Sequence, residues 1–418
     1  MRVLMLSWEY PPYVVGGLAR HTYHLSCALQ QQGVEVHVMT LGQAEDSQHS
    51  LEEGVHVHRI AVQRQHEVEF TTTVMETNLT FLEESLRVLD TPGAFDLIHA
   101  HDWLVFPAAR SLKHLFRLPL VATIHATEHG RCDGLHTLQQ HYISRLEWEL
   151  TYEAWRVILC SQFMKEDLQS FFDLPLEKMA VIPNGIIAPV EPGFLPVVRR
   201  KPMVLFVGRL VPEKGVRTLI GAMSAVLESC PESWCVIAGT GPMVQELQDL
   251  STARGVTDRV IFTGYVDDAI LSGLYRTAKV AVFPSFYEPF GIVALEAMAG
   301  GAPTIVSDVG GLGEIVEHRV NGHKVQPGDE EQLAAEIIGL LHQPEEGQRL
   351  VDEAYHRLRH QFSWAEIARQ TLSVYRGICV EHASTSWKQD RERPFGLEGA
   401  RAWGRRMMAR QYKGRASL

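Results

Sequence analysis

Residues 285–301 read Ser285-Phe-Tyr-Glu288-Pro-Phe-Gly291-Ile-Val-Ala-Leu-Glu296-Ala-Met-Ala-Gly-Gly301, with two carboxylates eight positions apart around a Pro-Phe-Gly turn. The apolar run Val280–Phe283 before it predicts a buried strand, and the helix formers of Ile292–Ala299 after it predict a helix that a glycine pair ends. Glu288 is therefore expected in a loop at the carboxyl end of a strand, and Glu296 inside the next helix. The first N–H groups of that helix favour an anionic ligand. Two isolated glutamates would more simply be solvated surface side chains, so the surrounding sequence has to decide.

Outward from this stretch, short β-rich runs alternate with helical patterns, which predicts parallel sheets with helices on both faces. The predicted strands are Val3–Leu6, Val34–Thr40, Val55–Ile60, Leu97–His99, Leu120–Ile124, Val157–Cys160, Ala180–Ile182, Val204–Val207, Cys235–Ala238, Val260–Thr263, Val280–Phe283 and Thr304–Ser307. Helices are predicted among others at Leu18–Gln31, Val74–Leu89, Leu135–Glu153 and Gln162–Phe172. Residues 187–202 hold four prolines in sixteen positions, which predicts an extended linker between two domains.

The bulk composition bounds the class of protein. Hydrophobic residues make up 45% of the 418 residues and charged residues 21%, which is typical of a globular chain with two domains. A formal net charge of −11 argues against nucleic acid as a partner. The six cysteines form no Cys-x-x-Cys pair and predict reduced thiols, and no apolar run has the length of a signal peptide or a membrane span. These features predict a cytoplasmic protein.

A second informative loop is Phe206-Val-Gly208-Arg209-Leu-Val-Pro-Glu-Lys214-Gly215, which follows a predicted strand. It puts Arg209 and Lys214 at the carboxyl end of that strand. Fixed cations at such a place favour a ligand that carries phosphate groups. The alternative is a surface ion pair of Lys214 with Glu213 or Glu228. No acidic cluster resembles a Mg²⁺ site, so we expect no metal.

Three further segments lie at strand ends. Tyr10-Pro-Pro-Tyr-Val-Val-Gly16-Gly17-Leu precedes the first helix, and its paired glycines let backbone N–H groups approach a phosphate, although Gly-Gly turns are common. His99-Ala-His101-Asp102-Trp103 ends another strand. Val121-Ala-Thr-Ile-His125-Ala-Thr-Glu128-His129-Gly-Arg131 ends a third, and its Glu128, His129 and Arg131 are weaker candidates for contacts with a polar ligand. With twenty histidines in the chain, only its position singles out His125 from structural histidines.

Together these motifs resemble the retaining glycosyltransferases of the GT-B fold, chiefly family 4 and the glycogen and starch synthases. Their order along the chain matches the family from about residue 1 to residue 380. The resemblance implies two facing Rossmann-like α/β domains and a C-terminal helix that crosses back to the N-terminal domain. Residues 362–375 suit that helix, because their apolar groups are spaced for one face and Ser363 is a candidate N-cap.

The implied organisation has five parts. They are an acceptor-side N-terminal domain at 1–186, a linker at 187–202, a nucleotide-sugar domain at 203–361, the crossover helix at 362–380 and a basic tail at 381–418. The tail contains nine Lys/Arg and four Asp/Glu. We interpret it as a solvated, flexible terminus, with a basic amphipathic helix over Arg401–Arg410 and weak membrane-surface contact as the alternative.

The resemblance also implies roles for residues at the positions that match. For the donor, Glu296 would bind the ribose, Arg209 and Lys214 the diphosphate, and the backbone N–H groups of Phe290, Gly291 and Ile292 the sugar. Glu288 would hold sugar hydroxyls and stabilise positive charge at the anomeric carbon. The remaining candidates are His125 beside the sugar, Asp102 near the sugar or acceptor, Gly16 and Gly17 against the phosphates, Asn184 facing the cleft, Gly241 under the nucleotide and Val266 at the base.

The function that follows is metal-independent, retaining transfer of glucose from ADP- or UDP-glucose to an acceptor such as an α-glucan, without a cofactor. No residue stands out as a covalent nucleophile, which favours front-face attack over double displacement. Val14 departs from the family, because bacterial glycogen and starch synthases usually have Lys there. Another hexose donor with a small-molecule or lipid-linked acceptor therefore stays open, as do a GT-B-type nucleotide-sugar epimerase and a non-catalytic sugar-binding scaffold.

Overall fold

The computed structural model describes residues 1–42, 47–61, 69–90, 94–187 and 196–389. The first sheet has eight strands: β1 (Arg2–Leu6), β2 (Glu35–Leu41), β3 (Gln48–Glu52), β4 (Val55–Ile60), β5 (Leu97–His101), β6 (Leu120–Ile124), β7 (Arg156–Leu159) and β8 (Met179–Val181). Their order is β3-β4-β2-β1-β5-β6-β7-β8. Neighbouring strands such as β1 and β2 pair in parallel, as the alternating pattern predicted.

One strand departs from the parallel prediction. β3 pairs antiparallel with β4, and Glu52 lies opposite Val55, so that only two residues join the strands. Those residues, Glu53 and Gly54, both have positive φ angles (48° and 78°), as a tight primed hairpin turn requires. The sequence analysis missed β3 because Gln48–Glu52 is mostly polar and depends on its partner strand for its hydrogen bonds.

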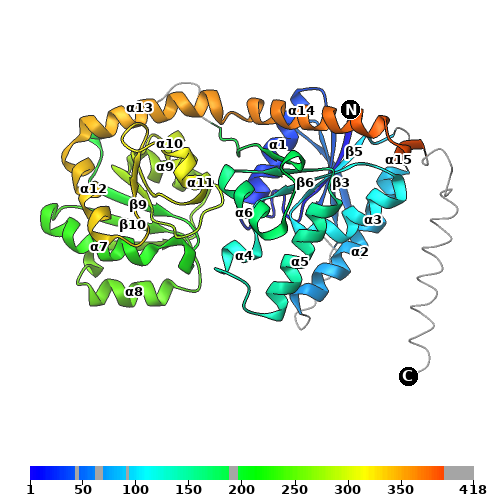
Figure 1. The fold of residues 1–418 in the computed structure, drawn as a ribbon. Helices are drawn as coiled ribbons and strands as arrows, with labels where there is room; N and C mark the ends of the chain where they lie inside the picture. The colour runs from blue at the N-terminus through cyan, green and yellow to red at the C-terminus, as the bar shows by residue number, and fades with distance from the viewer. Residues whose placement is uncertain (43–46, 62–68, 91–93, 188–195, 390–418) are drawn as a thin grey trace. The chain divides into compact units, whose positions relative to one another are not determined.

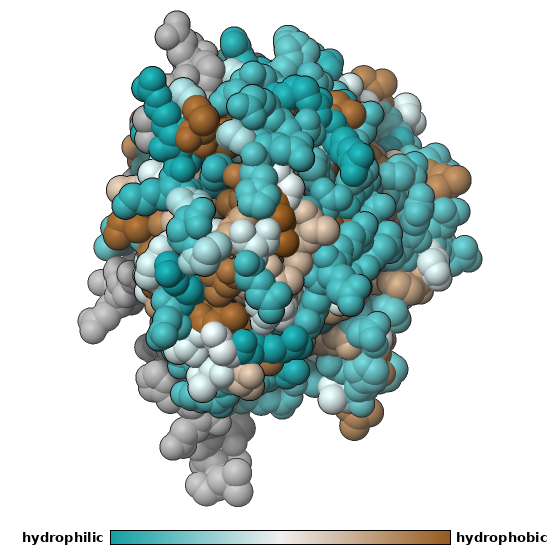
Figure 2. Space-filling view, turned by 90° about the vertical axis from the view of Figure 1, so that its left-hand side faces the viewer, coloured by the Kyte–Doolittle hydropathy of each residue, from teal (hydrophilic) through white to brown (hydrophobic). Residues whose placement is uncertain are grey.

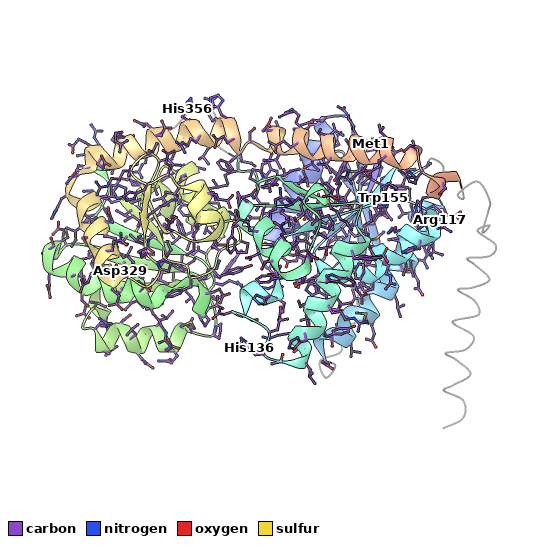
Figure 3. All side chains as sticks on the ribbon, in the orientation of Figure 1. Met1, Arg117, His136, Trp155, Asp329 and His356 are labelled. Atoms are coloured by element: carbon purple, nitrogen blue, oxygen red, sulfur yellow. The ribbon has the colours of Figure 1, made fainter. Side chains whose placement is uncertain are left out.

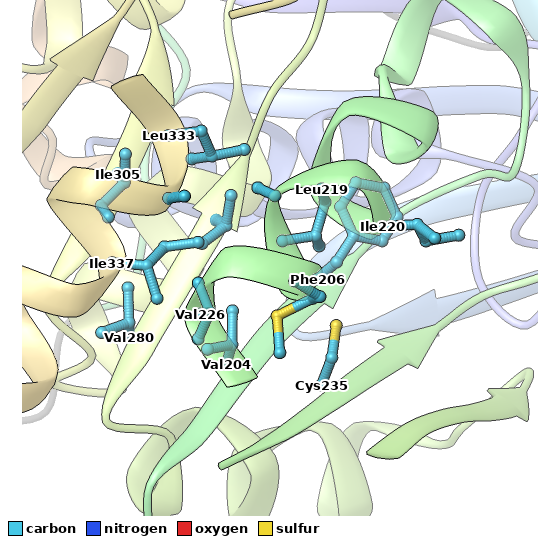
Figure 4. Packing of buried hydrophobic residues seen from close by; sticks show 14 of the residues in the cluster. Val204, Phe206, Leu219, Ile220, Val226, Cys235, Val280, Ile305, Leu333 and Ile337 are labelled. Atoms are coloured by element: carbon cyan, nitrogen blue, oxygen red, sulfur yellow. The ribbon is translucent and has the colours of Figure 1, made fainter. Parts of the chain in front are cut away.

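The second sheet has six strands: β9 (Met203–Val207), β10 (Trp234–Ala238), β11 (Val260–Gly264), β12 (Val280–Phe283), β13 (Thr304–Ser307) and β14 (His323–Val325). They run in the order β11-β10-β9-β12-β13-β14, and all their pairings are parallel. The sequence analysis missed only the three-residue β14. Side chains from these strands, among them Val204, Phe206 and Val280, pack with helix residues into a buried apolar cluster (Figure 4).

The helices are α1 (Gly17–Gln31), α2 (Phe70–Leu89), α3 (Phe106–Phe116), α4 (Glu128–Arg131), α5 (Leu138–Glu153), α6 (Gln162–Phe172), α7 (Val216–Ser229), α8 (Val244–Ala253), α9 (Asp268–Thr277), α10 (Ile292–Ala299), α11 (Gly310–Ile315), α12 (Glu330–His342), α13 (Pro344–Gln361), α14 (Trp364–Ala383) and α15 (Ser386–Gln389). In Figure 1, α7 and α8 lie on one side of β9 and β10, and α9, α10 and α13 lie on the other. Both sheets therefore have the Rossmann-like α/β architecture that the sequence predicted.

The contacts divide the chain into two compact units. Unit 1 comprises Met1–Thr123, Arg145–Val157 and the chain from Thr371 onward, and unit 2 comprises Ile124–Ser144 and Ile158–Gln370. The domain limits predicted from the sequence are a separate division and stay a prediction. The basic segment Arg401–Arg410 lies outside the described residues.

The C-terminal helix α14 starts where the sequence predicted a cap. Ser363 Oγ accepts a hydrogen bond from the Glu366 N–H at 3.3 Å. The second half of α14 belongs to unit 1, where the Tyr375 hydroxyl lies 2.6 Å from His99 Nδ1 on β5, and both side chains are fully buried. This hydrogen bond joins positions 276 residues apart in the sequence.

The face in Figure 2 is largely hydrophilic, with apolar side chains in scattered places. Across the described residues, no helix has both the length and the hydropathy needed to cross a bilayer. All six cysteines lie in this part of the chain, and none forms a disulfide. The cytoplasmic location stays a prediction.

Candidate active site

Two loops of unit 2 meet at the carboxyl edge of the second sheet, because β9 and β12 are neighbours. The loop after β9 ends at Gly215, whose φ of 66° suits glycine. A Cβ at Gly215 would overlap the Pro284 carbonyl, so the two backbones pack closer than any other residue would allow. The N–H of Phe286 then donates to the Glu213 carbonyl at 2.8 Å. Backbone contacts alone therefore hold the two loops together.

The contact between these two loops brings together two of the predicted catalytic residues. Lys214 Nζ lies 2.7 Å from Glu288 Oε2, and the two side chains are only 19% and 11% exposed. The sequence analysis considered Glu213 or Glu228 as a partner for Lys214, whereas the structure pairs it with Glu288. Partial burial strengthens such a pair, because little water screens it.

Arg209 lies on the same loop as Lys214 but in different surroundings. Its side chain is 59% exposed, and its Nη2 lies 3.3 Å from Glu213 Oε1. An exposed ion pair of this kind contributes little to stability, so the guanidinium can turn toward a ligand at small cost.

A pair of glycines that the sequence analysis missed, Gly310 and Gly311, packs against the backbone of the loop that carries Glu288. The N–H of Gly311 donates to the Glu288 carbonyl at 2.9 Å. A Cβ at Gly310 would overlap that carbonyl, and a Cβ at Gly311 would overlap the backbone of Phe290. The signal was present in the sequence, since Gly310-Gly311 follows a strand as the Gly16-Gly17 pair does.

The predicted sugar-contacting segment begins α10. Gly291 is the residue before the helix and has a φ of 106°, which only glycine adopts readily. Phe290 is buried and Ile292 is half-buried. Further along α10, Glu296 is half-buried and accepts a hydrogen bond from the Tyr275 hydroxyl at 3.3 Å. The first N–H groups of α10 and the Glu296 carboxylate thus lie on one short helix.

Two neighbouring loops carry Gly241 and Val266. The loop after β10 packs against the loop after β9, where the Leu210 N–H donates to the Thr240 carbonyl at 2.9 Å and a Cβ at Gly241 would overlap the Leu210 backbone. Val266 follows β11 and is half-buried, and the Tyr265 ring beside it is 82% exposed. The sequence analysis did not single out Tyr265, although an exposed aromatic ring suits stacking on a planar base.

In unit 1, the Gly16-Gly17 loop is held by a carboxylate from its own chain. Glu9 Oε2 accepts hydrogen bonds from the N–H groups of Val15 and Gly16, at 2.9 and 3.0 Å, and the Glu9 residue is only 9% exposed. Gly16 is the N-cap of α1 and Gly17 its first residue. Glu9 was missed by the sequence analysis, and it shows that these N–H groups do bind an anionic group.

Asp102 has a strained backbone. Its φ of 60° and ψ of 174° are rare for a residue other than glycine, and its N–H donates to the Thr123 carbonyl at 2.9 Å. Such strain persists only where surrounding contacts enforce it, and it concentrates at functional sites.

A cleft lies beside the Gly16-Gly17 loop within unit 1. Its volume is about 670 Å³, and it is lined by Pro11, Pro12, Tyr13, Leu41, Gln48, Glu52 and Arg59. Arg59 closes one wall through an ion pair with Glu52, and Arg59 Nη2 donates to the Pro11 carbonyl at 2.6 Å. Aromatic, amide and charged side chains of this kind suit a hydroxylated ligand.

His125 and Asn184 follow β6 and β8. Asn184 is 3% exposed. Part of the His125 surface is exposed, but dense protein packing around the ring lowers the pKa of His125 to about 4. The imidazole is therefore neutral at physiological pH.

Comparisons with known proteins agree with this geometry. A model described as glycosyl transferases group 1 matches residues 192–357, and one described as glycosyltransferase family 4 matches residues 15–188. An uncharacterised glycosyltransferase of Methanocaldococcus jannaschii is 39% identical over 90% of this chain and 98% of its own length. This chain belongs to the glycosyltransferases. A glycogen synthase of Mycobacterium tuberculosis is 38% identical over 90% of this glycosyltransferase and 94% of the relative.

Solved structures give the fold of the glycosyltransferase. A sucrose-phosphate synthase of Thermosynechococcus elongatus has a TM-score of 0.77 at 26% identity, covering 91% of this chain and 99% of that one. The catalytic domain of starch synthase IV of Arabidopsis thaliana, bound to ADP and acarbose, has a TM-score of 0.71 at 20% identity, covering 90% and 99%. The predicted GT-B fold is confirmed. The roles of individual site residues stay predictions.

Proposed function

We propose that this glycosyltransferase is a metal-independent, retaining hexosyltransferase that moves glucose from ADP- or UDP-glucose to an α-glucan. The observation that carries the proposal is the Lys214–Glu288 pair at the carboxyl edge of the second sheet, directly before the helix that holds Glu296. The 38% identity to a glycogen synthase supports a glucan as acceptor, and a starch synthase of the same fold has been solved with ADP bound.

The donor would bind to unit 2. Arg209 and Lys214 would contact the diphosphate, and these two positive charges would do the work that a metal ion does in other transferases. Glu296 would accept hydrogen bonds from the ribose hydroxyls. The backbone at Phe290, Gly291 and Ile292 would meet the sugar, while Gly241 would let the nucleotide pass close to the loop and Val266, with Tyr265, would contact the base.

The reaction would be a front-face substitution. The bond between the anomeric carbon and the β-phosphate oxygen breaks, and the acceptor hydroxyl oxygen forms its bond on the same face of the sugar. The proton of that hydroxyl passes to the leaving phosphate oxygen. Glu288 stabilises the positive charge at the anomeric carbon, and its ion pair with Lys214 orients this carboxylate.

Residues of the other predicted motifs would hold the sugar and the acceptor. His125 is neutral, so it would act as a hydrogen-bonding group and through its carbonyl, not as a cation. Asp102 and Asn184 would contact sugar or acceptor hydroxyls. Gly16 and Gly17 would approach the phosphates, and Glu9 would hold their loop in shape until the donor arrives.

A panel of nucleotide sugars tests this proposal. Release of nucleoside diphosphate is measured for each donor with and without glycogen or a maltooligosaccharide. Release from ADP- or UDP-glucose that rises with glucan supports a glucan synthase, and NMR of the product must then show an α-linkage. An inverted product would overturn the retaining mechanism.

One specific finding favours a second acceptor class. The 26% identity and TM-score of 0.77 to a sucrose-phosphate synthase support a small sugar phosphate as acceptor on the same machinery. In that case the rate of nucleoside diphosphate release does not depend on glucan and rises when phosphorylated monosaccharides are added. Conversion of a donor without an acceptor and without nucleotide release would indicate an epimerase. If no donor is converted at all, the protein is a non-catalytic sugar-binding protein.

A further inference from the structure

Four histidines lie on one face of the sheet edge formed by β2, β4 and β3. His37 on β2 is opposite His56 on β4, and His58 on β4 is opposite His49 on β3. His56 and His58 are two positions apart and therefore share a face. The His37 and His56 rings stack with centroids 4.4 Å apart, and the His49 and His58 rings stack at 4.5 Å. None of the residues predicted to bind the donor belongs to this cluster.

Hydrogen bonds between the rings fix which nitrogen of each is engaged. His37 Nδ1 lies 3.1 Å from His58 Nε2, and His56 Nδ1 lies 3.2 Å from His49 Nε2. The other ring nitrogen of His37, Nε2, lies 3.1 Å from Glu35 Oε1. Metal-binding histidines usually have this arrangement, because a hydrogen bond to one nitrogen orients the ring and leaves the other as the ligand.

We propose that Glu35, His37 and His56 form a binding site for a divalent transition metal of the zinc, nickel or copper class. One ligating atom from each residue lies within 4.8 Å of the other two. Two imidazoles and a carboxylate suit these metals, with ligand distances of about 2.0–2.2 Å for zinc, so that small side-chain rotations complete the site. His58 and His49 are positioning residues that orient the two ligand rings.

Arg2 on β1 is the competitor for this site. Its Nε lies 2.8 Å from Glu35 Oε1 and 3.3 Å from His37 Nε2, and its guanidinium stacks over the Phe95 ring at 4.5 Å. A metal ion must replace this cation at both ligands. Metal binding and the Arg2–Glu35 ion pair are therefore mutually exclusive, which makes Arg2 a direct test of the location.

Bound metal would link two strands. Glu35 and His37 come from β2 and His56 from β4, so coordination would join β2 to β4. β4 is also paired with the edge strand β3. Because the unfolded chain lacks this geometry, binding favours the folded state, and the melting temperature should rise with metal concentration.

The test uses the full chain, stripped of metal with a chelator and titrated with Zn²⁺ by calorimetry and with Co²⁺ by visible absorption. Wild type should bind one equivalent tightly, with a Co²⁺ spectrum of nitrogen and oxygen ligands and no thiolate charge-transfer band. His56→Gln, which removes a ligand, should weaken binding by more than about 100-fold, since loss of a residue that only orients a ligand typically costs about 10- to 100-fold, and Arg2→Leu should strengthen binding. His49→Gln, which removes only a positioning residue, should weaken binding less than His56→Gln.

A matched control uses an exposed histidine pair away from the proposed site, His356 and His360 on α13. Both are exposed, their ring centroids are 4.6 Å apart, and Figure 3 shows His356 projecting from the outer side of the helix. The double variant H356Q/H360Q should still bind one equivalent of metal tightly. The proposal is overturned if this variant loses that equivalent, if His56→Gln keeps it, or if wild type binds no tight equivalent at all. Wild-type melting temperature gives an independent readout, since it should rise with Zn²⁺ and not with Mg²⁺.

Discussion

Lys214 and Glu288 are 74 positions apart in the sequence, yet Nζ of the lysine lies 2.7 Å from Oε2 of the glutamate. Each residue comes from the loop after a neighbouring strand, β9 or β12, and the glycine at 215 lets those loops touch. The cation and the carboxylate that we propose as catalytic thus hold each other in place. The ion pair fixes the orientation of the side chain proposed to face the anomeric carbon.

Removal of either partner should abolish most turnover. Lys214→Ala and Glu288→Ala should each lower kcat by about 10²- to 10³-fold, because each removes charge stabilisation in the transition state. Steady-state release of nucleoside diphosphate measures the effect. Arg217→Ala is the control, since Arg217 lies on α7 in an exposed ion pair with Glu246 and should leave kcat unchanged. Near-normal turnover in either of the first two variants would contradict the site assignment.

Gly310→Ala should impair both folding and turnover. The new Cβ would overlap the Glu288 carbonyl, and the φ of 49° is strained for alanine. We expect about 1–3 kcal/mol of destabilisation in chemical denaturation, together with a fall in kcat as the Glu288 loop shifts. Gly339→Ala, in α12, places its Cβ in open space and should be neutral or slightly stabilising. Equal behaviour of the two variants would show that Gly310 does not support the loop.

Asp167 on α6 makes stability depend on pH. Desolvation raises the pKa of Asp167 to about 6 from its ordinary 3.8, so the folded state favours the protonated acid. This contribution to stability is complete below pH 3.8 and is lost as pH rises through 6. Asp167→Asn should therefore stabilise the protein at pH 7, by about 1 kcal/mol after allowance for partial solvent exposure, and have no effect at pH 3.5. Denaturation at both pH values checks it, with the exposed Asp173→Asn as control.

Tyr375→Phe should destabilise unit 1. The change removes the hydroxyl partner of His99 Nδ1 in a fully buried location, which costs about 1–3 kcal/mol when the remaining group stays unsatisfied. The midpoint of chemical denaturation measures this cost. Tyr265→Phe removes a hydroxyl from a side chain that is 82% exposed and should leave the midpoint unchanged. If the two variants behaved alike, the buried hydrogen bond would not anchor α14.

Several elements were predictable residue by residue. β12 at Val280–Phe283 and α10 at Ile292–Ala299 have the predicted limits, because an uninterrupted apolar run and a run of helix formers ended by glycine depend on local sequence alone. β3 was not predictable in this way. Its polar residues form a strand because a two-residue turn returns them to β4.

In the candidate site, too, some features were predictable from the sequence and others were not. The positions of Arg209, Lys214 and Glu288 at the ends of strands, and of Glu296 in the following helix, followed from the sequence pattern, and the GT-B fold followed from motif order. The partner of Lys214, the support from Gly310 and Gly311, and the carboxylate of Glu9 under the Gly16-Gly17 loop did not. Each of these contacts depends on how closely two backbones approach, and no local pattern encodes that distance.

The sequence by itself determined the alternation of strands and helices, the loops that carry the charged residues, and membership in the glycosyltransferases. These properties follow from local propensity, apolar periodicity and motif order. Only the tertiary structure decided which distant side chains meet: Lys214 with Glu288, and four histidines from three strands in one stack. The reason is strand order, because the sheet brings β9 beside β12 and β2 beside β4, although other elements separate them along the chain.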